Sequence, residues 1–144
     1  MVNLIHTQDL TSKAYEDAKR IRLDVFVNEQ HVPESIEIAD EDQAIHCVLY
    51  DDFQQALGTV RLFPIDETAM KIQRMAVAKD DRGKGIGKQL MEYAEQVAKT
   101  HQANTLILGA QLHALDFYHS LGYEPFGDTY IEANIQHQNM KKTV

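Results

Sequence analysis

The sequence predicts an α/β domain with a mixed (α+β) sheet, in which an antiparallel meander leads into a parallel β-α-β unit with helices on both faces. Three β-rich runs follow one another between residues 44 and 77, separated by polar turns. An amphipathic helix then connects the third run to an apolar run at residues 105–110, so these two should pair in parallel through a right-handed crossover. No repeat, low-complexity run or linker interrupts the chain, so we expect one domain spanning residues 1–144.

The N-terminal part should supply one strand and one helix ahead of a polar stretch. Residues 2–5 suit a short strand, and Ser12 can cap a helix whose apolar residues recur at helical spacing. Pro33 disfavours helix in the residues before it, so this helix should end near Asn28. Residues 27–42 are polar, acidic toward their end and without clear periodicity. We expect them to form a loop of the kind that often carries binding groups.

Four further strands follow from β-rich or apolar runs bounded by turn residues. Residues 44–50 and 57–63 should form a hairpin, and residues 70–77 should add the third strand of the meander. The run at residues 105–110 is apolar almost throughout, which is typical of a strand covered on both faces.

Helical spacing and turn residues place the remaining elements. A long helix should begin near Lys88 and close in the polar run at residues 99–101. A short helix at residues 113–121 should end at Gly122, where glycine favours a left-handed cap. Two closing strands are then expected at residues 123–126 and 130–140, with Gly127-Asp128 as the turn between them.

Composition argues against several classes of site. The single cysteine, Cys47, excludes an internal disulfide, and its apolar neighbours indicate a buried thiol rather than a reactive one. The seven histidines show no ligand spacing, so we expect no metal. The N-terminus lacks signal-peptide features and no window approaches the ~20 apolar residues of a membrane span, so we expect a cytoplasmic protein without a membrane partner.

Charge is distributed unevenly along the chain. Residues 1–67 hold five Lys or Arg against fourteen Asp or Glu, whereas residues 68–144 hold nine against eight. The acidic half would repel nucleic acid, so we expect no nucleic-acid partner. The same half could attract a cationic amine substrate or could simply be a solvated acidic surface.

A glycine-rich turn follows the strand that ends at residues 73–77. Glycines let the backbone adopt positive φ and let a ligand approach the main chain, and the first amides of the following helix attract anions. Arg82, Lys84 and Lys88 add three cations with no acid among them. The turn therefore predicts a cradle for a phosphate or pyrophosphate.

Spacing argues against two common phosphate loops. A Walker loop would need glycine where Arg82 stands and a hydroxyl where Gln89 stands. A dinucleotide fingerprint beginning at Gly83 would need a third glycine where Lys88 stands.

The pattern [QR]-x-x-G-x-[GA], met by Arg82, Gly85 and Gly87, resembles the pyrophosphate loop of the GNAT N-acetyltransferases. Residues 25–30 and 44–46, with Glu132, His137 and Met140, resemble the ElaA/YjcF-like branch of that superfamily, so the resemblance covers nearly the whole chain. It implies the GNAT acyl-CoA N-acyltransferase fold and acetyl-CoA as co-substrate. It also implies direct attack on acetyl-CoA, in a ternary complex, by a primary amine of a small molecule or peptide. GNAT relatives are often dimers, so a homodimer is possible.

The resemblance also implies which residues bind the cofactor. The main chain around Met75 and Val77 would receive the pantetheine arm, although the two side chains suit a hydrophobic core. The Gln111 amide would bond the same arm in place of the family's usual Asn. The implied cofactor-binding residues are Met75, Ala76, Val77, Arg82, Gly83, Lys84, Gly85, Ile86, Gly87, Lys88, Gln111, Phe117 and Tyr118.

Tyr118 is the candidate general acid. It lies in a stretch from Gln111 to Tyr123 that resembles the GNAT pattern N-x-x-A-x-x-[LF]-Y-x-x-x-G-[FY], in which the Tyr hydroxyl points at the CoA sulfur. A phenol with a pKa near 10 is protonated at neutral pH, so it can give a proton to a thiolate. The alternative is a tyrosine that only packs in the core.

The proton acceptor for the amine is less clearly indicated. Glu29, in the polar loop, is the first choice, with the alternative that it is solvated or paired with Arg22. The other candidates are His46, His113, Glu132 and His137, and a histidine within a strand is often structural. The expected substrate-binding residues are Glu29, His46, Arg74 and His113.

Two other functions use the same features. A degenerate GNAT domain could bind acyl-CoA as a sensor without transferring it, although an intact Tyr118 would then be unnecessary. An enzyme outside the superfamily could use the anion cradle for CoA or a nucleotide. Release of free thiol with an amine panel separates a transferase from a sensor, and nucleotide binding without CoA binding would identify the third class.

Overall fold

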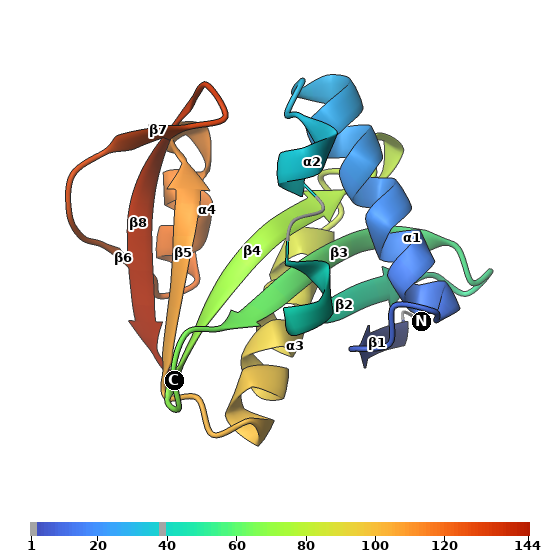
Figure 1. Cartoon of the computed structure of the whole chain (residues 1–144), viewed down its shortest axis with the longest axis horizontal. Helices are drawn as coiled ribbons and strands as arrows, with labels where there is room; N and C mark the ends of the chain where they lie inside the picture. Colours follow the sequence, from blue (N-terminus) through green and yellow to red (C-terminus); the bar gives the residue numbers. More distant parts are fainter. Residues whose placement is uncertain (1–2, 38–39) are drawn as a thin grey trace.

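The computed structural model describes residues 3–37 and 40–144. The described residues form one eight-stranded mixed sheet with the order β1-β2-β3-β4-β5-β8-β6, in which β7 also pairs with β8. Figure 1 shows this sheet dividing into a broad N-terminal part and a narrower C-terminal part. No helix among the described residues is both long enough and apolar enough to cross a bilayer.

The N-terminal part is the predicted antiparallel meander. It contains β1 (Asn3–Thr7), β2 (Ile45–Tyr50), β3 (Ala56–Pro64) and β4 (Ala69–Val77), each antiparallel to the next. The predicted hairpin and third strand are therefore confirmed, with ends that differ by one or two residues. Of the expected first strand, residue 2 lies outside the described residues.

The first helix is α1 (Lys13–Arg22), and it continues as a π-helical segment, η1 (Leu23–Glu29), to the predicted end near Asn28. The Ser12 hydroxyl accepts a hydrogen bond from the Tyr15 amide at 3.2 Å, which confirms the N-cap. The expectation of an uninterrupted loop afterwards is wrong, because α2 (Glu34–Glu37) and a 3₁₀ turn, η2 (Glu41–Gln43), lie there. Elements of one turn are too short to produce a periodic pattern.

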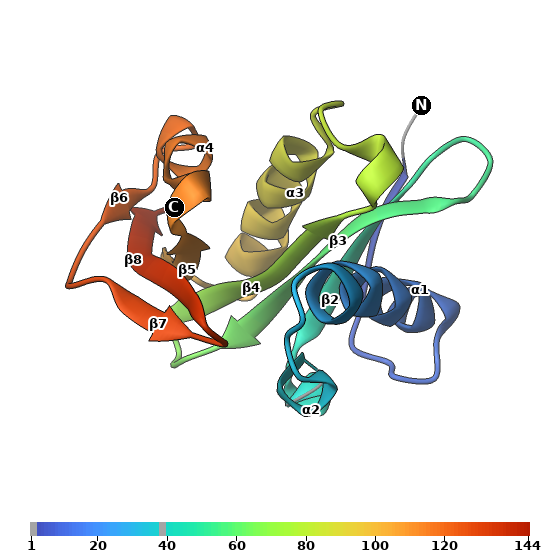
Figure 2. The same ribbon diagram turned by 90° about the horizontal axis from the view of Figure 1, so that it is seen from above.

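The helices α1 and α3 (Ile86–Thr100) cover opposite faces of the meander (Figure 2). The face under α3 forms the main core, in which Leu90 and Met91 pack against β2, β3 and β4. Gly58 permits the close approach, since a Cβ there would lie 2.8 Å from a Leu90 methyl carbon. Cys47 is fully buried on this face, and burial raises the pKa of its thiol to about 12, as expected for a structural cysteine.

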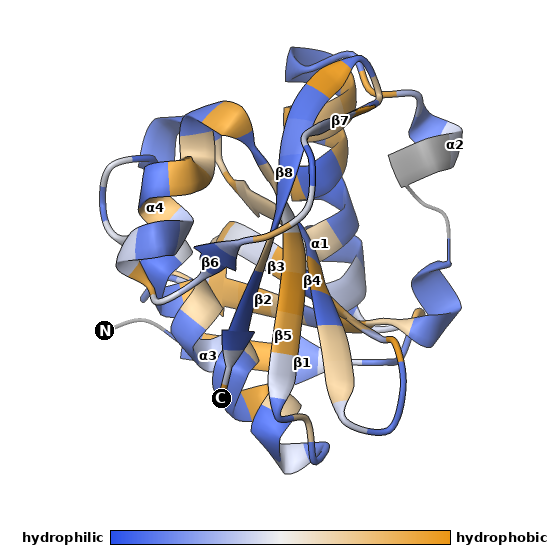
Figure 3. Cartoon of the chain, turned by 90° about the vertical axis from the view of Figure 1, so that its left-hand side faces the viewer, coloured by the Kyte–Doolittle hydropathy of each residue, from blue (hydrophilic) through white to orange (hydrophobic). Residues whose placement is uncertain are grey.

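The C-terminal part begins with β5 (Thr105–Gln111), which pairs in parallel with β4 as predicted. The prediction that both faces of β5 are covered is wrong. Buried and half-buried residues alternate along this strand, because only its face toward α3 is enclosed. Figure 3 shows that β5 is largely hydrophobic, whereas the adjacent β8 (Ile135–Thr143) is mostly hydrophilic.

The chain closes with α4 (Leu115–Ser120), preceded by a 3₁₀ turn, η4 (Leu112–Ala114), and followed by β6 (Glu124–Pro125). Gly122 has a φ of +97°, and the Tyr123 amide donates to the Tyr118 carbonyl at 3.1 Å, which confirms the glycine cap. The single strand expected at residues 130–140 is instead two strands, β7 (Tyr130–Glu132) and β8. Ala133 and Asn134 form the turn between them with positive φ angles, without the glycine that usually signals such a turn.

Candidate active site

A cleft opens where β4 and β5 separate. The two strands pair only from Ala69 opposite Thr105 to Ile72 opposite Leu108, and beyond that point both continue without pairing with each other (Figure 1). β4 also contains a bulge, because its residues 74 and 75 lie opposite the single residue 60 of β3. Arg74 in this bulge has a φ of +57°. Main-chain groups of β4 after Ile72 are therefore released from pairing with β5 at the cleft.

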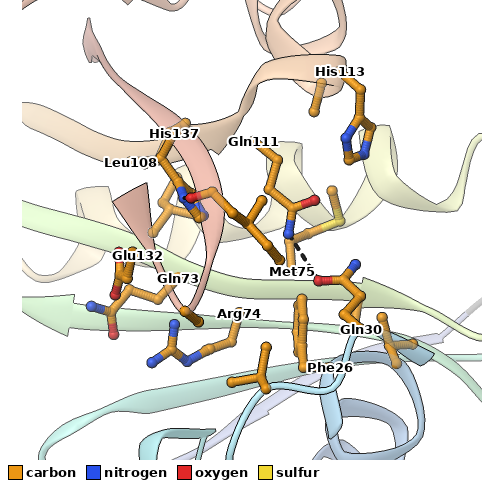
Figure 4. A pocket seen from close by; sticks show the side chains of 18 of the residues that line it. Phe26, Gln30, Gln73, Arg74, Met75, Leu108, Gln111, His113, Glu132 and His137 are labelled. Carbon is orange, nitrogen blue, oxygen red and sulfur yellow. Dashed lines mark hydrogen bonds between the residues drawn. The ribbon is translucent and has the colours of Figure 1, made fainter. Parts of the chain in front are cut away.

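The cleft contains a cavity of about 380 Å³, a volume in the range of small-molecule sites. Its walls come from η1 and the residues that follow it, from β4, from β5, from η4 and α4, and from the β7–β8 hairpin. The predicted site residues that line it are Arg74, Met75, Ala76, Val77, Arg82, Gln111, His113, Tyr118, Glu132 and His137. Figure 4 shows these walls meeting around a common space.

The glycine-rich turn has the backbone that the sequence predicted. Gly83 and Gly85 have φ angles of +82° and +78°, and nothing lies within 4 Å of where their Cβ atoms would be. Gly87 differs, because a Cβ there would lie 3.3 Å from the Phe117 ring. Gly83 and Gly85 thus allow positive φ angles and leave open space beside the main chain, whereas Gly87 allows Phe117 to pack closely against α3.

The N-terminus of α3 is suited to an anion. The helix begins at Ile86, two residues before the predicted start, because Gly85 already acts as its N-cap. The first amide to donate to a helical carbonyl is that of Gln89, to Gly85 at 3.2 Å, and no side chain caps the end. The amides of residues 86–88 therefore precede the helical hydrogen bonds, and the first turn contains no acid.

Two of the three predicted loop cations have acidic partners. Arg82 donates to Glu29 at 2.9 Å, and Lys84 donates to Asp81 at 3.1 Å. Neither pair was predicted, because no acid lies among the three cations in the sequence and the only partner considered for Glu29 was Arg22, as an alternative to a solvated carboxylate. Because these ion pairs are partly exposed to solvent, they are weak enough for a phosphate to replace them.

Tyr118 lies on α4 and contributes to the cavity wall. Its ring makes edge contacts with Phe117 at 5.0 Å and Tyr123 at 6.3 Å between centroids. Burial raises the pKa of the Tyr118 hydroxyl to about 12. The phenol therefore remains protonated across the neutral range and can serve as a proton donor at the cavity.

The candidate bases lie in three places. His113, Glu132 and His137 line the cavity, whereas Glu29 and His46 do not. The His46 side chain is buried on the α1 side of β2, where its Nε2 lies 3.1 Å from the Glu41 carbonyl oxygen and burial lowers its pKa. Glu29 lies at the glycine-rich turn, where it contacts Arg82. The structure thus does not bring these two residues to the cavity with the other three.

A buried polar cluster that was not predicted supports one wall of the cavity. Arg61 donates to the Gln73 side-chain oxygen at 2.6 and 3.0 Å and to the Glu41 carboxylate at 3.0 Å. Burial alone would raise the pKa of Glu41, but Arg22 and Arg61 hold it below its usual value. The available signal was an arginine within the mostly apolar run at residues 57–63, which forms β3.

Gln111 and Gln30 also meet across the cleft. The Gln111 amide, which the GNAT resemblance assigned to the pantetheine arm, donates to the Gln30 side-chain oxygen at 2.9 Å (Figure 4). This contact links the end of β5 to the residue after η1. Gln30 was not predicted as a site residue, because nothing local distinguishes it from other polar residues of that segment.

Comparison with known proteins identifies the fold and the family together. The family model described as "Acetyltransferase (GNAT) domain" matches residues 8–144. A relative named "Uncharacterized N-acetyltransferase YjcF", from Bacillus subtilis (strain 168), is 34% identical over 129 residues, covering 88% of this chain and 91% of that protein.

Solved structures agree with this family. An acyl-CoA N-acyltransferase from Pseudomonas aeruginosa has a TM-score of 0.86 at 29% identity, covering 99% of this chain and 100% of that one. Escherichia coli ElaA has a TM-score of 0.85 at 26% identity, covering 99% of each chain. A more distant GNAT acetyltransferase from Elizabethkingia anophelis, solved with acetyl-CoA bound, shares the fold at a TM-score of 0.73 and 15% identity, covering 99% and 98%. The chain therefore belongs to the GNAT acetyltransferase family, in its ElaA/YjcF-like branch.

Proposed function

We propose that this acetyltransferase uses acetyl-CoA to acetylate a primary amine by direct attack in a ternary complex. The observation that carries the proposal is the position of Tyr118. Tyr118, whose hydroxyl stays protonated, lines a cavity that β4 lines as far as Val77, and the chain leads from there through Arg82 into the open glycine-rich turn. An anion site, a thioester-sized cavity and a proton donor thus follow one another along the cleft.

The residues of the turn fit the diphosphate of CoA. Gly83 and Gly85 leave open space beside the main chain, and the first amides of α3 are oriented for an anion. Arg82, Lys84 and Lys88 would supply positive charge around it. When bound, acetyl-CoA would supply the activated acetyl thioester.

The chemistry needs a proton donor and a proton acceptor. The amine nitrogen forms a bond to the thioester carbonyl carbon while the carbon–sulfur bond breaks. Main-chain amides of β4 beyond Ile72 would stabilise the oxyanion, and Tyr118 would protonate the departing thiolate. An acceptor that arrives as an ammonium ion would first give one proton to a base and then to water. A second proton, lost from the nitrogen after the attack, would return to Tyr118 through water, so the products are the amide, free CoA thiol and one proton.

The base can be identified by comparing two substitutions. Glu29 is the residue favoured by the sequence, and Glu132 is a carboxylate that lines the cavity. In Glu29→Gln and Glu132→Gln, the residue that acts as base should show a kcat lower by ~10²-fold or more, with the fall relieved at high pH as the free amine becomes abundant. Equal and small losses in both variants would exclude both carboxylates and direct attention to His113 and His137.

The function itself is tested by thiol release from acetyl-CoA against a broad amine panel. Steady release with at least one amine, and an acetylated product in mass spectrometry, is the expected result. CoA binding without release against any amine would favour a sensor and contradict the proposal. The cytoplasmic location and the homodimer stay predictions, which cell fractionation and size-exclusion chromatography can check.

A further inference from the structure

The two ends of the cavity differ in chemistry. Gln73, Arg74, Glu132 and His137 gather at one end, whereas Met75 belongs to the other (Figure 4). Met75 also contacts the start of α3, since its methyl carbon lies 3.5 Å from where a Cβ of Gly87 would be. The end that holds Met75 therefore adjoins the cofactor loop, and the polar end is left for the acceptor.

The orientation of the Gln73 amide is fixed by its neighbour. Arg61 donates two hydrogen bonds to the Gln73 side chain, and a guanidinium group can only donate. The atom that faces Arg61 must therefore be the Gln73 oxygen. The NH₂ group is consequently the part of this amide that can contact another molecule, and it can only donate.

Arg61 is itself held firmly. It is 2% exposed and is paired with the buried carboxylate of Glu41 at 3.0 Å. The Gln73 amide therefore rests on a buried support rather than on a mobile side chain, so little conformational freedom remains to be lost when it binds a ligand. Arg74 follows directly at the bulge and adds a guanidinium to the same wall of the cavity.

We propose that the acceptor is a small amine that carries a carboxylate, such as an amino acid. Gln73 and Arg74 present donors that match a carboxylate, and a charge-assisted pair of this kind is stronger than a neutral hydrogen bond. Glu132 and His137 come from the β7–β8 hairpin and would receive the amino group. The cavity of about 380 Å³ must also accommodate the thioester arm, so the acceptor is small.

This inference rests on the transferase function proposed above, and matched acceptors test it separately. Glycine, β-alanine and leucine are compared with methylamine, ethylamine and 3-methylbutylamine, which lack only the carboxylate, and with the corresponding carboxamides. Thiol release gives kcat/KM, expressed per unprotonated amine so that differences in amine pKa do not count. We expect the best carboxylate to exceed its carboxylate-free partner and its carboxamide by roughly 10- to 100-fold.

Gln73→Glu is the informative variant. The new carboxylate keeps an oxygen for Arg61 and nearly the same shape, but it removes the donor and repels an anion. The ratio of kcat/KM for carboxylate over carboxylate-free acceptors should fall by roughly 10- to 100-fold, with the Kd for CoA unchanged. Gln96→Glu, the same change at an exposed position of α3, is the control and should keep the wild-type ratio.

The outcomes separate the two proposals. Equal or better use of carboxylate-free amines or carboxamides, or an unchanged ratio in Gln73→Glu, would overturn the carboxylate inference while the transferase function stands. CoA binding without thiol release from any acceptor would overturn the transferase function, and this inference would fall with it.

Discussion

The two ends of the cleft are built in different ways. The cofactor end depends on one continuous segment, residues 82–88, whose glycines, cations and helix start act together. The acceptor end combines Gln73 and Arg74 of β4 with Glu132 and His137 from more than fifty residues later. Its wall is supported in turn by Arg61 and Glu41. A cofactor shared by the whole family can be bound by one short sequence motif. A site for a specific acceptor instead requires that residues distant in sequence are brought together by the fold.

The largest expected effect lies in the support of the acceptor end. Glu41→Gln should lower the free energy of unfolding by about 3 kcal/mol, because it leaves Arg22 and Arg61 buried without the carboxylate between them. Chemical denaturation of both proteins at pH 7 measures the difference. A loss below about 1 kcal/mol would mean that the buried cluster is not a firm support.

The pH dependence of the same variant sharpens this point. The pKa of Glu41 is lowered in the folded protein, so its contribution is complete above the ordinary glutamate pKa of about 4.3 and is lost as pH falls through the lower folded value. The stability difference between wild type and Glu41→Gln should therefore shrink only in that acidic window. A difference that vanished already between pH 7 and 5 would contradict the assignment.

The cofactor end is tested next. Gly85→Glu should weaken CoA binding by more than ~100-fold, because it places bulk and negative charge beside the first amides of α3. Gly127→Glu is the matched control, since Gly127 also has a positive φ (+71°) and open space but lies far along the chain in the β6–β7 connection. Calorimetry with CoA should show near wild-type affinity for the control. Similar losses in both would indicate backbone strain rather than a lost anion site.

Tyr118→Phe tests the link between the two ends. Removing the hydroxyl should reduce kcat by ~100-fold while the Kd for CoA changes little, because only proton donation is lost. The Phe ring keeps the contacts with Phe117 and Tyr123, so stability should be preserved. Single-turnover thiol release measures the effect, and an unchanged rate would remove Tyr118 from the chemistry.

The smallest expected effect concerns Asp81. Asp81→Asn releases Lys84 and removes a negative charge near the anion site, so CoA should bind about 2- to 5-fold more tightly. The gain should diminish at high salt, because exposed charges are screened. Weaker binding in this variant would show that the Asp81–Lys84 pair orders the turn instead of competing with phosphate.

The difference between the cofactor end and the acceptor end also explains which features of the fold and of the site could be predicted from the sequence. The meander, the crossover, the glycine turn and the position of Tyr118 each follow from local patterns of a few residues. The Arg61–Gln73 contact and the Gln30–Gln111 bridge join residues 12 and 81 positions apart, and no local pattern reports such pairs. Glu29 was favoured as a base because it was expected in a polar loop, but it is the last residue of η1, where it pairs with Arg82 and does not itself line the cavity.

The short turns were missed for a related reason. α2 and η2 last a single turn, and the Ala133-Asn134 turn that splits the last predicted strand contains no glycine or proline. The conformation of the Ala133-Asn134 turn is set by the hairpin around it, which is held by stacking of Tyr130 on His137 at 5.6 Å between ring centroids and by the β7–β8 pairing register.

A crystal structure with CoA bound tests the central claim most directly. We expect the diphosphate on the main-chain amides of residues 83–88 and the sulfur within hydrogen-bonding distance of the Tyr118 hydroxyl. A diphosphate bound elsewhere, or a sulfur on the far side of the cleft from Tyr118, would contradict it.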